Sequence, residues 1–156
     1  MSDSSKHIFE EAIRHCRWKH VLCNDVLTHS KLQEGSLHEF LSMSFEEILL
    51  YVHDICSNVK GIGMLSVYDI TSAICRYNKI NIEKIYIVGN GPKKAIRLLD
   101  VQVKIQKIQN LRIKYVEIPE IIKAFTDGKY EIDLHITNSV NGDDFESYIC
   151  NWQKDK

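Results

Sequence analysis

Apolar residues in the first half of the chain recur at helical spacing. Residues 4–22 fit an amphipathic helix, and residues 24–41 have the composition of a loop with scattered apolar anchors. Ser44 begins the sequence Ser-Phe-Glu-Glu, in which the Glu47 side chain can reach back to the amide of the capping residue. This capping box predicts a helix from Ser44 to about Ser57.

The pattern after residue 63 predicts a second helix and then a mixture of helix and strand. Apolar positions indicate a helix over Met64–Tyr77 that ends at Asn78, and a later helix with Pro92 at its first position. Residues 101–109 alternate like a strand, although 103–111 also fits a helix, and both interpretations remain open. The remaining segments are predicted as extended chain over 111–120, a short helix over Glu120–Phe125, a second strand candidate over 129–137, and an acidic-started terminal helix.

Length and composition indicate one ordinary globular domain over 1–156. The chain is 44% hydrophobic and 26% charged, with only two prolines and seven glycines, which argues against long disordered segments. No apolar run approaches the roughly 20 residues that span a bilayer, and the polar, acidic start is unlike a signal peptide. With five cysteines in an unpaired pattern, we expect reduced thiols and a cytoplasmic protein, or a nuclear one if eukaryotic.

Charge is distributed unevenly along the chain. Residues 59–115 hold eleven Lys and Arg against three acids, a net charge of +8, whereas 1–58 carry −4 and 116–156 carry −5. A basic centre between acidic flanks is typical of a protein that meets an anionic partner, and chance clustering of charge on solvated faces is the alternative.

The basic block contains two Gly-x-Gly stretches, 28 positions apart. In the first, Val-Lys-Gly-Ile-Gly, Gly61 permits a positive φ in a sharp turn and Ile62 can lock two helices together. Gly63 leaves the first amides of the following helix open, at the positive end of its dipole. An anion such as a phosphate can dock there, with Lys60 beside it.

Residues 44–77 resemble the helix-hairpin-helix motif on these features. The resemblance implies a mainly α-helical fold with a helix-hairpin-helix core over about 44–99. The charge count adds an acidic C-terminal portion over 116–156. The resemblance also implies binding to the phosphate backbone of DNA or RNA without sequence reading, with a monovalent cation held by turn carbonyls in some members. The longer pattern from Gly61 onward is similar to a set of small bacterial proteins, a similarity that carries no catalytic residue over.

The second stretch, Ile-Val-Gly-Asn-Gly-Pro-Lys-Lys, has two interpretations. As another hairpin it would complete a tandem pair, with Lys93, Lys94 and Arg97 contacting phosphates; as a strand-to-helix turn it resembles the glycine turn of a dinucleotide-binding fold. Cations at a helix N-terminus oppose the dipole, which favours a bound anion nearby. The sequence leaves the choice open.

Metal and catalytic patterns are incomplete. His15, Cys16, His20 and Cys23 have some zinc-like spacing but lack a completing pair, so packed thiols and surface histidines are favoured. On a strand, Glu131, Asp133 and His135 would share a face that could hold Mg²⁺, but nothing else completes such a site. The sequence favours a protein that is not an enzyme and needs no metal.

The sequence therefore predicts a nucleic-acid-binding protein, with DNA favoured over RNA and no membrane partner. The alternative is a protein-interaction module whose hairpin only packs two helices; a nucleotide-binding or metal-dependent phosphodiester enzyme is less favoured. The predicted binding residues are Lys60, Gly61, Ile62, Gly63, Gly89, Asn90, Gly91, Lys93, Lys94 and Arg97.

Overall fold

The structure, a computed structural model, describes residues 42–57 and 62–156, and its chain divides into two compact units. The N-terminal unit is Met1–Ile80 and the C-terminal unit is Asn81–Lys156. The boundary falls inside the predicted core of 44–99, so the two Gly-x-Gly stretches belong to different units. The single domain over 1–156 stays a prediction.

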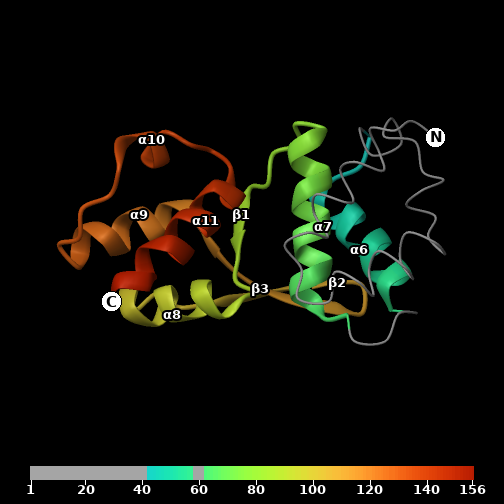
Figure 1. Cartoon of the computed structure of the whole chain (residues 1–156), viewed down its shortest axis with the longest axis horizontal. Helices are drawn as coiled ribbons and strands as arrows, with labels where there is room; N and C mark the ends of the chain where they lie inside the picture. The colour runs from blue at the N-terminus through green and yellow to red at the C-terminus, as the bar shows by residue number, and fades with distance from the viewer. Residues whose placement is uncertain (1–41, 58–61) are drawn as a thin grey trace. The chain divides into compact units, whose positions relative to one another are not determined.

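Two helices form the described part of the N-terminal unit (Figure 1). Helix α6 covers Phe45–Cys56, and its start confirms the capping box: the Glu47 amide donates to Ser44 Oγ, and the Ser44 amide donates to Glu47 Oε1. Helix α7 covers Met64–Tyr77 and ends at Asn78 as predicted. The helices pack through apolar faces. Their buried residues are Phe45, Ile48, Leu49, Val52 and Cys56 of α6 and Val67, Tyr68, Ile70, Ile74 and Cys75 of α7.

Residues 58–61 lie outside the described residues, as do the predicted helix over 4–22 and the cysteine and histidine cluster within it. The α6–α7 packing fits the predicted pair of helices, while the helix-hairpin-helix assignment itself stays a prediction.

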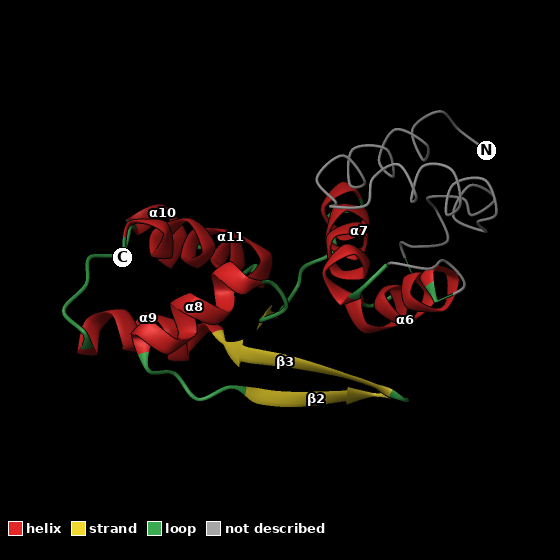
Figure 2. Ribbon diagram, turned by 60° about the horizontal axis from the view of Figure 1, so that its bottom comes forward, coloured by secondary structure: helices red, strands yellow, loops and turns green. Residues whose placement is uncertain are grey.

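The C-terminal unit combines a small sheet with helices (Figure 2). Its elements in chain order are β1 (Lys84–Tyr86), α8 (Asn90–Leu99), β2 (Lys104–Ile108), β3 (Leu111–Glu117), α9 (Ile118–Asp127), α10 (Leu134–Thr137), α11 (Gly142–Trp152) and a final 3₁₀ turn, η2 (Gln153–Asp155). Counting the described residues, most lie in helices and a minority in strands, which confirms the predicted mainly α fold with short strands.

The sheet is antiparallel, with β3 between β1 and β2. Alternation along β3 turns Val116 toward the helices, and its partner across the strands is Ile85. Both are fully buried in one apolar cluster with α8, α9 and α11. The largest side chains of that cluster are Phe125 and Phe145; Trp152 packs against it, its ring 5.1 Å from that of Phe125.

Several sequence predictions are corrected in this unit. Of the two interpretations left open for 101–111, the strand is correct: Lys104–Ile108 form β2. The second strand candidate, 129–137, is wrong: α10 occupies its second half, and Asp133 precedes that helix. Pro92 is the third residue of α8 and not the first, because the helix begins two residues earlier at Asn90. The alternation in 129–137 was misleading because the segment is short and polar, with too few apolar residues to distinguish the strand period from the helix period.

The start of α8 lies tightly against α11, and we expect Gly91→Ala to test this contact. A Cβ at Gly91 would come within 2.5 Å of Cys150 Sγ, an overlap that costs about 2 kcal/mol and outweighs the helix propensity gained from alanine, about 1 kcal/mol. Urea unfolding should show a loss of stability in Gly91→Ala. Combining it with Cys150→Ala removes the sulfur and should restore stability; a double variant as unstable as the single one would contradict the packing.

Candidate nucleic-acid interface

The second Gly-x-Gly stretch is a strand-to-helix turn. Strand β1 precedes it, so the tandem-hairpin interpretation is wrong. The dinucleotide-binding interpretation fails too, because that fold requires a parallel sheet and every strand pair in the described chain is antiparallel. Gly89 is the N-cap of α8 in an extended conformation, without a side-chain cap.

Packing limits what the first turn of α8 can bind. Gly91 lies against Cys150, as described above, and Pro92 has no amide hydrogen to offer to an anion. The amide of Lys93 already donates to the carbonyl of Gly89. Of the main-chain amides in this turn, only those of Asn90 and Gly91 are left to bind a phosphate. The glycine at position 91 serves the packing of α8 against α11.

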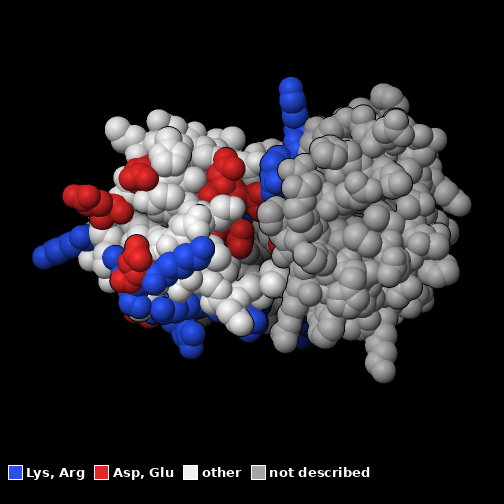
Figure 3. Space-filling view, in the orientation of Figure 1, with Lys and Arg blue, Asp and Glu red and all other residues white. Residues whose placement is uncertain are grey.

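The cationic side chains of α8 lie on two different faces of the helix. Asn90, Lys93 and Arg97 are spaced three and four residues apart, so they share one face of the helix, and all three are exposed. Lys94 turns elsewhere, and its ammonium donates to the main-chain oxygen of Lys156. In Figure 3, Lys and Arg side chains gather along the lower edge of the C-terminal unit, where α8 lies.

The first Gly-x-Gly stretch leads into α7. Lys60 and Gly61 lie outside the described residues, whereas Ile62 is half-buried and Gly63 is the exposed N-cap of α7. No side chain of the described residues caps this end, and among them a Cβ at Gly63 would meet no atom within 4 Å. Among the described residues, packing therefore does not demand glycine at this position. The phosphate contact at the first amides of α7 stays a prediction.

A further basic surface lies on the hairpin formed by β2 and β3, which both views show running out beyond α8, α9 and α11 (Figures 1 and 2). The strand register places Lys107 directly opposite Arg112, and Ile105 opposite Lys114. These four residues share one face by alternation, and all are exposed, Ile105 by 59%. We call this set of side chains the basic ribbon.

The basic ribbon holds like charges in direct opposition. Two cations facing each other across neighbouring strands are destabilising, yet Lys107 and Arg112 occupy such a pair, with Lys114 on the same face. Within the described chain none of the three has an acidic partner. Lysines often protect edge strands from aggregation, which could account for Lys107 on β2. The same protection applies to Arg112 and Lys114, since β1 pairs only with residues 115–117 of β3. Edge protection does not require Lys107 and Arg112 to lie directly opposite each other, and that opposition is what remains to be explained.

The lysines on the opposite face of the sheet are engaged. The Lys84 ammonium lies 4.7 Å from the ring centroid of Tyr115. Lys104 Nζ lies 3.1 Å from Glu120 Oε1 and 3.7 Å from Glu117 Oε2. The hydrogen bond from Lys104 lowers the pKa of Glu120, and the same contact raises the pKa of Lys104. The lysines of one face therefore contact an acidic or aromatic partner, whereas the cations of the other face have no such partner among the described residues.

We expect Lys104→Met to raise the pKa of Glu120. The pKa of Glu120 is depressed in the folded chain, so the ion pair stabilises the folded state at pH values above the usual pKa of glutamate. This stabilisation is lost as the pH falls through the folded-state pKa. A carboxyl NMR titration measures the shift directly. Lys107→Met, on the other face of the same strand, is the matched control; an equal response to both substitutions would contradict the pairing.

The sequence did not single out the basic ribbon. Its cations belong to the basic block of 59–115. Which of them lie together depends on the register of β2 and β3, and the sequence did not fix that register because 103–111 also fitted a helix. The signal that could have found it is the alternation of residues 105–114 around a two-residue turn, with basic residues on one face.

The acidic residues near the predicted strand 129–137 do not assemble a metal site. Asp133 occupies the N-cap position of α10 without a side-chain capping hydrogen bond, and its carboxylate lies 3.9 Å from the imidazole of His135. Throughout the described ranges, no group of three His, Cys, Asp or Glu side chains is placed to hold a metal ion. None of the helices described is long and apolar enough to cross a membrane.

Comparison of the chain with models of protein families, with curated proteins and with solved structures finds no match.

Proposed function

We propose that this protein binds nucleic acid through the phosphate backbone, without reading sequence. The basic ribbon is the observation that carries the proposal. Three cations without an acidic partner among the described residues lie on one face of a protruding strand pair, and two of them are in direct opposition. An array of phosphates relieves that repulsion by placing negative charge between the cations.

The shape of the basic ribbon suits a duplex. A two-stranded ribbon fits the major groove of B-DNA, whose walls are lined by phosphates. Exposed Lys and Arg on the ribbon would contact those phosphates, and Ile105 beside them offers an apolar contact to sugar or base edges. Double-stranded DNA is accordingly the favoured ligand.

The residues predicted from sequence contribute at two further places. On α8, Lys93 and Arg97 provide exposed positive charge, with Asn90 as a hydrogen-bonding neighbour. On α7, the uncapped amides behind Gly63 offer the phosphate contact that the resemblance to helix-hairpin-helix proteins implies, with Lys60 and Gly61 in the preceding turn. A monovalent cation at that turn belongs to the same proposal.

The experiment is a fluorescence anisotropy titration of the full chain against duplex DNA, single-stranded DNA and RNA of mixed sequence, at about 50 and 200 mM salt. We expect binding at the lower salt, the tightest to duplex DNA, and a loss of affinity at the higher salt because counterions compete for phosphates. No binding to any probe at the lower salt would contradict the proposal.

A further inference from the structure

Two aromatic rings meet at the end of α11 and hold a lysine ammonium between them. The ring centroids of Tyr130 and Trp152 lie 5.1 Å apart, with the ring planes at 78° to each other. The ammonium of Lys156 lies over both rings, 5.0 Å from the centroid of Trp152 and 5.6 Å from that of Tyr130. Both distances are within the roughly 6 Å at which a ring face attracts a cation. We call the two rings the aromatic corner.

The aromatic corner is supported from behind by the core of the C-terminal unit. The fully buried ring of Phe125 lies 5.1 Å from the ring of Trp152 and 6.3 Å from that of Tyr130, measured between centroids. Gly128 gives a second support, because a Cβ there would come within 2.6 Å of Tyr130 Cε2. These contacts do not involve Lys156, so a different cation that enters the corner finds the rings already in place and loses little free energy to ordering them.

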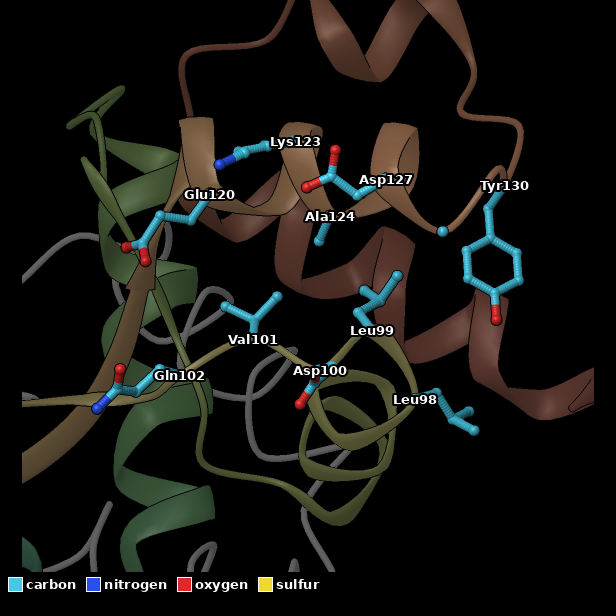
Figure 4. Close-up of a pocket in the computed structure, with 11 residues that line it drawn as sticks. Leu98, Leu99, Asp100, Val101, Gln102, Glu120, Lys123, Ala124, Asp127 and Tyr130 are labelled. Atoms are coloured by element: carbon cyan, nitrogen blue, oxygen red, sulfur yellow. The ribbon is translucent and has the colours of Figure 1, made fainter.

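The aromatic corner is reachable from solvent, and its occupant is weakly held. Tyr130 is 38% exposed and stands at one end of an open pocket of about 530 Å³ (Figure 4). Lys156 is exposed as well. Its main-chain groups form hydrogen bonds with Lys94 Nζ and with the carbonyl of Gln153, but its ammonium has no acidic partner among the described residues. A cation that suits the rings better can therefore displace this ammonium.

The chemistry of the corner favours a methylated ammonium over a plain one. The ammonium of lysine carries three N–H donors, which ring faces satisfy poorly compared with water. A trimethylammonium keeps the positive charge, has no N–H donor and presents methyl groups to the rings, which is why aromatic surroundings are suited to such cations. Two rings also cover more of the cation than the single ring of Tyr115 covers at Lys84.

We infer that the aromatic corner binds a trimethyllysine side chain presented by a peptide segment of a partner protein, in the place that Lys156 occupies here. The observed occupant indicates this ligand class, because it is an alkylammonium that reaches the rings on a four-carbon stem. Trimethyllysine has the same stem, whereas the short, hydroxyl-bearing stem of choline differs from it. The site is separate from the basic ribbon and does not depend on nucleic-acid binding.

The test is an NMR titration of the full chain, labelled with ¹⁵N, with a capped tripeptide that carries trimethyllysine between two alanines. We expect this peptide to shift the indole signal of Trp152 and the amide signals of residues 129–131, and to leave those of residues 84 and 115 in place. A peptide with an uncharged tert-butyl group in place of the trimethylammonium keeps the shape and should bind at least about fivefold more weakly. Unmodified lysine peptide and choline should both bind more weakly than the trimethyllysine peptide.

Three variants separate binding at the aromatic corner from other effects. Lys156→Ala removes the internal competitor and should strengthen binding of the trimethyllysine peptide about threefold to sixfold. Tyr130→Leu removes one ring face and should weaken binding at least about fivefold, whereas Tyr130→Phe keeps the ring face and should bind like the wild type. Thermal unfolding of each variant confirms that the fold persists.

Four results would each overturn the inference. The first is the absence of shifts with millimolar trimethyllysine peptide even in Lys156→Ala. The second is equal binding of the tert-butyl peptide, which would mean that the charge is not recognised. The third is equal affinity of Tyr130→Leu and Tyr130→Phe, and the fourth is binding of choline as tight as that of the peptide.

Discussion

Gly142→Ala should lower the free energy of unfolding of the C-terminal unit by about 4 kcal/mol, the largest stability effect of a single methyl group that we expect in this chain. Gly142 opens α11, and its amide donates to the carbonyl of Ile82. A Cβ at this position would overlap the main-chain carbonyl of Lys84. Main-chain atoms of a strand cannot rotate away as a side chain can, so either β1 or α11 has to move.

Urea unfolding followed through the amide signals of β1 and α11 measures this loss. Gly63→Ala is the matched control, because a Cβ there meets no atom within 4 Å and the change at an N-cap costs less than about 1 kcal/mol. Equal stability of the two alanine variants would show that β1 and α11 do not approach as closely as the structure has them.

Lys107→Glu should make the protein more stable and a poorer binder of nucleic acid. The substitution replaces a repulsive cross-strand pair with an attractive one, because Glu would face Arg112, and such pairs contribute about 0.2–1 kcal/mol. It also removes a phosphate contact and adds repulsion, so affinity for duplex DNA at low salt should fall at least about tenfold. A gain in stability with a loss of function is the mark of a residue retained for binding.

The control for this prediction is Lys129→Glu, which changes charge by the same amount at an exposed position after α9. Thermal unfolding and anisotropy titration of both variants give the two readouts. If Lys107→Glu and Lys129→Glu weakened binding equally, net charge and not the basic ribbon would govern the interaction.

Local signals in the sequence predicted the helices well. The capping box at Ser44 and the stop at Asn78 act within a few residues of chain, so α6 and α7 have nearly the predicted bounds. Alternation was less informative: it indicated β2 correctly but failed over 129–137, where a short helix forms. Short polar segments carry too few apolar residues for one period to exclude the other.

The contribution of each glycine depended on tertiary contacts that sequence does not record. The sequence indicated Gly91 as part of a phosphate-binding turn. In the structure, the absence of a side chain at Gly91 leaves room for the sulfur of Cys150. Gly142 drew no attention in the sequence, although it lies against the main chain of β1. The basic ribbon was not predicted for the same reason, because Lys107 and Arg112 lie opposite each other only when β2 and β3 are paired.

The salt dependence of binding tests the central claim most directly. Each phosphate neutralised on duplex DNA contributes about 0.9 to the slope of log Kobs against log salt concentration. If Lys107 and Arg112 contact phosphates, the variant Lys107→Gln with Arg112→Gln should show a slope shallower than the wild-type slope by about 1.8. Parallel lines for wild type and variant would contradict the account, because they would mean that the basic ribbon does not touch the nucleic-acid backbone.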